Sequence, residues 1–266
     1  MIETARQPVI DDRRDPPTWP ERLWIVRHGE SAGNVARARA LSTGAGRIIV
    51  EGRDMDVPLS PLGIEQARAL GHWFARSGMA LPQTILASPY ARARETATLF
   101  REASGCGRDL PICFDERLRE KEFGILDGLT AAGIAEEEPQ QARLRAELGK
   151  FYHRPPGGES WCDVILRLRS LMDTVALHHG GRRVMIVAHQ VVVLCLRYIL
   201  EGLNEEEILA IDRAAPIVNC GVTEYAFDPG AGPGGGLRLS SFNATAPLIE
   251  ERAAVTAEPR SQVANP

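Results

Sequence analysis

Residues 23–34 (LWIVRHGESAGN) join a short apolar run to a cluster of polar and charged side chains. The apolar run, residues 23–26, has the length and composition of a strand that is buried on both faces. It ends at Arg27 and His28. In open α/β sheets, ligands bind in the crevice beyond the carboxyl ends of the strands. The stretch therefore predicts a central strand with a functional site at its end.

Two other apolar runs have the same layout. Residues 84–87 lead into Ser88 and then Arg92, and residues 184–187 lead into Ala188-His189-Gln190. Segments with helical spacing alternate with these strands: residues 61–77, 91–103, 160–179 and 190–200. This alternation predicts an α/β fold, a three-layer sandwich whose mostly parallel central sheet is flanked by helices.

Composition excludes several classes of protein. The chain has 266 residues and a net charge of −4, so no basic field favours nucleic acid. No stretch approaches the roughly 20 apolar residues that span a bilayer. Residues 1–20 lack a basic segment followed by an apolar run, so a secretory signal is not expected. Five widely spaced cysteines without a CxxC pair are typical of a reduced, cytoplasmic protein, and a zinc site is not expected.

Two arginines and two histidines at strand ends suit a phosphate group. Arg27 and Arg92 can donate bidentate hydrogen bonds to phosphate oxygens. One imidazole, of His28 or His189, can act as nucleophile and the other as a hydrogen-bond or charge partner. A single histidine after a buried strand is weak evidence, because most such residues are structural, but four such side chains at one sheet edge indicate an anion site.

Five motifs in order resemble those of the histidine phosphatase superfamily, the phosphoglycerate-mutase-like proteins. They cover most of the chain from residue 23 to residue 248. The matching stretches are RHGESAGN at 27–34, DVPLSPLG with Gln66-Ala67 at 56–67, SPYARA with Thr96-Ala97 at 88–97, LRE with Gly124 and Gly128 at 118–128, and GES at 158–160 with VAH at 187–189.

The resemblance implies a role for each site residue. His28 would attack phosphorus and carry a phosphohistidine, and Arg27, Arg92 and His189 would hold the transferred phosphoryl oxygens. Glu120 would protonate the leaving alcohol and then deprotonate water. The substrate-binding residues that complete the set are Asn34, as a donor, and Gln190, which follows the second histidine as in the fructose-2,6-bisphosphatase domain. No metal or other cofactor is implied.

Neighbouring residues compete for two of these roles. Glu122 is the rival of Glu120, although the spacing to Gly124 and Gly128 favours Glu120. Arg94 is the rival of Arg92, but it lies two positions along the expected helix and should face elsewhere. His153 is interpreted as a surface or rim residue.

One domain with loose ends accounts for the chain. Residues 1–20 are charged and punctuated by proline, which predicts a flexible leader. The phosphatase domain is expected over residues 21–249, with an insertion at about 36–55, and a disordered tail over 250–266. The insertion is either a solvated loop or a lid over the site, and the sequence leaves both open.

The favoured function is a metal-independent phosphatase acting on a small phosphate monoester, such as a sugar or carboxylic-acid phosphate. Its partner would be a small phosphorylated metabolite, with no nucleic acid or membrane, and a homodimer is compatible with the sequence. Two alternatives stay open: phosphoglycerate-mutase-type phosphoryl transfer, and a catalytically silent binder of phosphorylated ligands. A binder has no use for the acid Glu120, which favours an enzyme.

Overall fold

The structure, a computed structural model, describes residues 18–232 and 234–258. Most of the expected leader and residues 259–266 of the expected tail lie outside this part. The last leader residues are not loose: Trp19 packs against the core, and Pro20 is buried. The packed part of the chain therefore includes residues 19 and 20, which precede β1.

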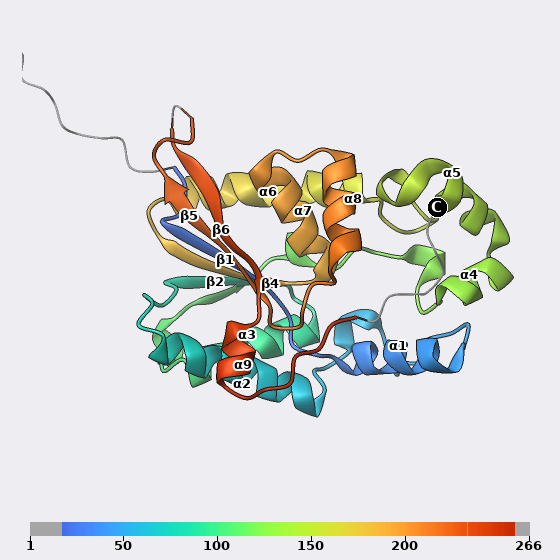
Figure 1. Cartoon of the computed structure of the whole chain (residues 1–266), viewed down its shortest axis with the longest axis horizontal. Helices are drawn as coiled ribbons and strands as arrows, with labels where there is room; N and C mark the ends of the chain where they lie inside the picture. Colours follow the sequence, from blue (N-terminus) through green and yellow to red (C-terminus); the bar gives the residue numbers. More distant parts are fainter. Residues whose placement is uncertain (1–17, 233, 259–266) are drawn as a thin grey trace, which may run out of the picture.

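A six-stranded mixed sheet forms the centre of the molecule, in the order β3-β2-β4-β1-β5-β6 (Figure 1). The first four strands in this order are parallel to one another, and β5 and β6 form an antiparallel hairpin at one edge. The strands are β1 (Arg22–Arg27), β2 (Thr84–Ala87), β3 (Ile112–Phe114), β4 (Arg183–Ala188), β5 (Val222–Asp228) and β6 (Gly236–Ala244).

Helices cover both faces of this sheet (Figure 1). One layer contains α6 (Trp161–His178), α7 (Gln190–Glu201) and α8 (Glu205–Ala214), and the other contains α2 (Pro61–Arg76), α3 (Ala91–Ala103) and α9 (Ala246–Glu250). Side chains alternate along β1 as a pleat requires. Leu23 and Ile25 join the core under α6 and α7, whereas Trp24 and Val26 join the core under α2 and α3. The predicted three-layer sandwich is confirmed.

Three helices lie beyond the carboxyl ends of the parallel strands: α1 (Ala32–Thr43), α4 (Ala131–Glu137) and α5 (Pro139–Tyr152) (Figure 1). The insertion at 36–55 forms most of α1 and the loop that follows. Backbone hydrogen bonds join that loop to the segment before α4. The Thr130 N–H donates to the Gly46 carbonyl at 2.9 Å, and the Ile48 N–H donates to the Gly128 carbonyl at 2.7 Å. The insertion is thus packed against the start of α4.

The prediction of a disordered tail is wrong for residues 250–258. Gln66 Nε2 donates to the Ala254 carbonyl and to Thr256 Oγ1, both at 2.8 Å, and the Asn219 N–H donates to the Thr256 carbonyl at 2.8 Å. Hydrogen bonds from the buried residues Gln66 and Asn219 hold this segment, and such bonds leave no apolar periodicity in the sequence. It runs from α9 to the start of α1 (Figure 1).

Candidate active site

Strand register brings the three polar clusters together. Arg27 pairs with Ala188 across β1 and β4, and Ala87 pairs with Val187 across β2 and β4. The residues that follow each strand therefore share one edge of the sheet. The imidazole centroids of His28 and His189 are 5.1 Å apart. The four side chains predicted to meet beyond the strand ends, Arg27, His28, Arg92 and His189, lie near one another at this edge.

His28 has one ring nitrogen fixed and the other available. Nδ1 lies 2.7 Å from the Gly29 carbonyl oxygen. Because a carbonyl oxygen only accepts, Nδ1 carries the proton and Nε2 keeps its lone pair. Burial, with Arg92 and Arg27 nearby, holds the pKa of His28 well below its ordinary value of 6.5. The residue is therefore a neutral imidazole whose Nε2 carries a free lone pair.

His189 is fully buried beside it. Its Nε2 lies 2.8 Å from Ser88 Oγ, and its Nδ1 has no hydrogen-bond partner among the residues the structure describes. Burial first, and then Arg92 and His28, lower the pKa of His189 well below 6.5. A buried polar atom without a protein partner is costly, and an oxygen acceptor of a bound ligand would satisfy it.

Arg27 and Arg92 are both buried, and each contacts a carboxylate from a distant segment. Arg92 Nη1 and Nη2 donate to the two carboxylate oxygens of Asp54, at 3.1 and 3.0 Å. Arg27 Nη2 lies 3.3 Å from Glu258 Oε1, and Arg27 Nε has no partner in the described chain. Two anion-binding guanidinium groups thus face the same site.

Glu120 is the carboxyl group suited to acid–base chemistry. Burial raises its pKa to about 7, against the opposing effects of the Lys121 backbone N–H and of Arg92. A carboxyl group with this pKa can give and take a proton near neutral pH. Its rival Glu122 accepts a hydrogen bond from the Tyr90 hydroxyl at 2.8 Å. Arg94, the rival of Arg92, is exposed and lies over the Phe114 ring.

The two predicted substrate-binding residues differ in their surroundings. Asn34 Oδ1 accepts from the Ser31 N–H at 3.0 Å and caps α1, while its Nδ2 donates to Glu258 Oε1 at 3.1 Å. Asn34 and Arg27 therefore share one anion. Gln190 opens α7, and its Oε1 has no partner among the described residues.

Two residues that hold the backbone around His28 were not predicted from the sequence. Asn219 is buried, and its Nδ2 donates to the His28 carbonyl at 3.1 Å. Thr96 Oγ1 accepts from the Gly29 N–H at 3.1 Å and donates to the Arg92 carbonyl at 2.6 Å. Thr96 lies in the motif at residues 88–97, which is a sequence signal for it, whereas Asn219 carries no local signal. His153, expected at the surface, is instead buried within reach of Gln141.

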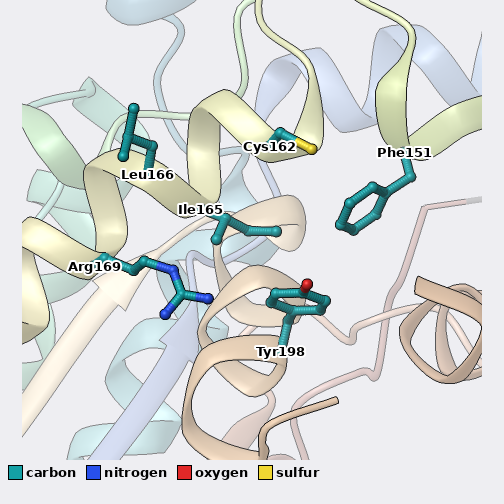
Figure 2. Close-up of a pocket in the computed structure, with 6 residues that line it drawn as sticks. All are labelled: Phe151, Cys162, Ile165, Leu166, Arg169 and Tyr198. Carbon is teal, nitrogen blue, oxygen red and sulfur yellow. The ribbon is translucent and has the colours of Figure 1, made fainter. Parts of the chain in front are cut away.

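Other features of the fold lie apart from this site. A pocket between α5, α6 and α7 contains none of the residues predicted for the site (Figure 2). It is lined by Phe151, Cys162, Ile165, Leu166, Arg169 and Tyr198. Within residues 18–232 and 234–258, no group of three or more His, Cys, Asp or Glu side chains could hold a metal ion. No helix in this part of the chain is long and apolar enough to cross a membrane.

The comparison with protein families decides the assignment. The family model of the histidine phosphatase superfamily, branch 1, matches residues 23–233. The chain belongs to this superfamily. The match begins within β1, which carries Arg27 and leads into His28, and it extends through both core layers. The predicted family is therefore confirmed.

Similar proteins include both mutases and phosphatases. A 2,3-bisphosphoglycerate-dependent phosphoglycerate mutase of Methylobacterium radiotolerans is 32% identical over 203 residues, covering 74% of this chain and 89% of the relative. The mycobacterial glucosyl-3-phosphoglycerate phosphatase, solved with inorganic phosphate, has a TM-score of 0.64 and 28% identity. That match covers 85% of this chain and 99% of the neighbour.

A third solved structure, Bacillus stearothermophilus YhfR, has a TM-score of 0.65 and 28% identity, over 85% of this chain and 98% of that one. Together with the family match, these neighbours support a phosphoric monoester hydrolase.

Proposed function

We propose that the protein hydrolyses a small phosphate monoester through a phosphohistidine at His28, without a metal ion. One observation carries the proposal: two buried groups, Arg27 Nε and His189 Nδ1, have no hydrogen-bond partner in the described chain beside a neutral His28. A phosphoryl group offers the oxygen acceptors that these nitrogens lack, provided that His189 Nδ1 carries the proton. It also neutralises the positive charge that the two arginines bring together.

The first step breaks the phosphorus–oxygen bond of the ester. His28 Nε2 attacks phosphorus, and the ester oxygen leaves as the alcohol with the proton of Glu120. Arg27, Arg92 and His189 hold the nonbridging oxygens, whose charge is stabilised most where the site excludes water. The pKa of about 7 for Glu120 leaves a large fraction protonated at neutral pH.

The second step regenerates the enzyme. Glu120, now a carboxylate, takes a proton from water as the water oxygen attacks phosphorus. The phosphorus–nitrogen bond breaks, and inorganic phosphate leaves. Asn34 and Gln190 are assigned to substrate binding, since Asn34 Nδ2 already donates to an anion and Gln190 Oε1 is unpartnered.

A panel of sugar, alkyl and carboxylic-acid phosphates with EDTA present tests this function. We expect phosphate release with wild type and none above background with His28→Ala. Phosphate release that disappears with EDTA would contradict metal independence. Interconversion of phosphoglycerates, in place of phosphate transfer to water, would support the mutase alternative. The Methylobacterium relative, a phosphoglycerate mutase, suggests these substrates for the test. Binding without turnover would support the silent binder.

A further inference from the structure

Ser88 directly follows β2 and is completely buried. Its Oγ is 2.8 Å from His189 Nε2, and it accepts a hydrogen bond from the Tyr90 N–H at 3.3 Å. The Tyr90 ring packs edge-on against the His189 ring, with centroids 5.3 Å apart. Tyr90 thus contacts both members of the Ser88–His189 pair, the hydroxyl through its backbone N–H and the imidazole through its ring.

The direction of the Ser88–His189 hydrogen bond follows from the available acceptors. Within the described residues, His189 Nε2 is the one acceptor within hydrogen-bond distance of the Ser88 hydroxyl. If Nε2 carried a proton and donated it to Oγ, the buried hydroxyl hydrogen would have nowhere to go. A buried donor left without an acceptor costs about 1–3 kcal/mol. The hydroxyl therefore donates, and Nε2 accepts.

The tautomer of His189 then follows. A neutral imidazole carries one N–H, so an accepting Nε2 puts the proton on Nδ1. His189 is kept neutral by its burial and by Arg92. Nδ1 is the nitrogen that has no partner in the described part of the chain. The protein thus holds an unused N–H donor in a ring whose centroid is 5.1 Å from that of His28.

We propose that Ser88 is a positioning residue: its hydroxyl holds His189 as the Nδ1–H tautomer and so supplies a neutral donor to the transferred phosphoryl group. No proton moves in this role. Ser88 orients the donor, and Nδ1–H donates to a nonbridging oxygen as charge develops there. The inference rests on the proposed function, because it needs a phosphoryl group beside His28.

Nitrogen NMR of ¹⁵N-histidine-labelled wild-type protein reads the tautomer directly, with His189→Asn used to assign the resonances. We expect a protonated Nδ1 and an unprotonated Nε2 at His189. In Ser88→Ala, the Nε2–H form should appear. Ser104→Ala is the matched control, because Ser104 is also buried but donates to the Arg101 carbonyl at the end of α3. A wild-type protein protonated at Nε2 would overturn the inference.

Kinetics provide a second readout. Loss of an oxyanion donor itself costs about 10²–10³ in kcat. Ser88→Ala keeps the His189 donor and removes only the hydroxyl that orients it. We therefore expect kcat to fall about 10- to 100-fold with KM little changed. Ser88→Thr, which keeps the hydroxyl, should restore most of this loss if it folds. An Ala variant with wild-type kcat would contradict the role, whatever its stability.

The two proposals fail differently. An Nδ1–H tautomer in a protein that hydrolyses no phosphate monoester would contradict the proposed function and leave the Ser88–His189 hydrogen bond intact. An Nε2–H tautomer in an active phosphatase would contradict only the role of Ser88. The NMR measurement needs no turnover, which keeps the outcomes separate.

Discussion

Glu258 Oε1 lies 3.3 Å from Arg27 Nη2, so the C-terminal segment places a carboxylate against the guanidinium group that we assign to phosphate binding. Asn34 Nδ2 donates to the same oxygen at 3.1 Å. An incoming phosphoryl group that uses Arg27 and Asn34 competes with this carboxylate. The segment is held in place by Gln66 and Asn219 rather than by the ion pair alone.

Removing the charge of Glu258 should tighten phosphate binding. A partly exposed ion pair is worth up to about 1 kcal/mol, so Glu258→Gln should lower the Kd for inorganic phosphate by about fivefold in calorimetry. Glu251→Gln is the control, since Glu251 lies in the same segment but pairs with Arg76 on α2. Equal Kd values for wild type and Glu258→Gln would show that the carboxylate does not compete.

Arg92 is held by Asp54, which couples the insertion to the site. If bound phosphate takes over the hydrogen bonds of Arg92, the loop after α1 loses the ion pair between Asp54 and Arg92. We expect limited proteolysis within residues 44–53 to be faster with saturating phosphate than without it. Asp54→Asn should make the two cleavage rates equal, because it weakens the contact with Arg92 both with and without phosphate. Slower cleavage with phosphate would instead support closure of the insertion as a lid.

The pH dependence should follow Glu120. Glu120 must be protonated to act as the acid, and its pKa is about 7. The acid form is therefore lost as pH rises through 7, and kcat/KM for alkyl phosphates should decline above that value. His28 stays neutral throughout, since its pKa lies well below 6.5. A kcat/KM that stays level to pH 9 would remove Glu120 from this role.

Replacing Glu120 tests the same assignment at fixed pH. Glu120→Gln should lower kcat on alkyl phosphates by about 10²–10⁴, the usual contribution of a general acid. The loss should be smaller with p-nitrophenyl phosphate, whose leaving group needs no proton. Glu122→Gln is the matched control, because Glu122 is bonded to the Tyr90 hydroxyl instead. If Glu122→Gln showed the larger loss, the two roles would have to be exchanged.

Close backbone approach should make Gly63 intolerant of a side chain. A Cβ at this position would lie 1.9 Å from the Glu30 carbonyl oxygen, so α2 and the loop after His28 would have to separate. We expect Gly63→Ala to lower the free energy of unfolding by about 1–3 kcal/mol in urea denaturation, with loss of activity. At Gly33 in α1 the nearest atoms are 3.5 Å away. Gly33→Ala should therefore be neutral or stabilising.

The strands that carry the site were predictable, whereas β3, α4 and α5 were missed. Three buried parallel strands appear in the sequence as apolar runs, and the residues after them meet because parallel strands end at one edge. β3 is three residues long with two exposed side chains, Cys113 and Phe114, so it has no such run. α5 contains a non-helical Gly149, which interrupts its periodicity.

The sequence predicts the site residues that directly follow a buried strand. It does not predict the residues that distant segments bring to the same place. The clustering of Arg27, His28 and His189 at one sheet edge could be predicted from their positions after buried strands. Asp54 and Glu258 were not predicted, because their contacts with the two arginines join segments that no local pattern connects. The tautomers of His28 and His189 also depend on partners that only the fold supplies.

Trapping the phosphoenzyme tests the central claim most directly. Wild-type protein mixed with a ³²P-labelled phosphate monoester and quenched within milliseconds should carry label on His28, stable in base and released in acid. His28→Ala should carry none. Turnover without any labelled protein, or label retained in His28→Ala, would contradict a phosphohistidine at His28.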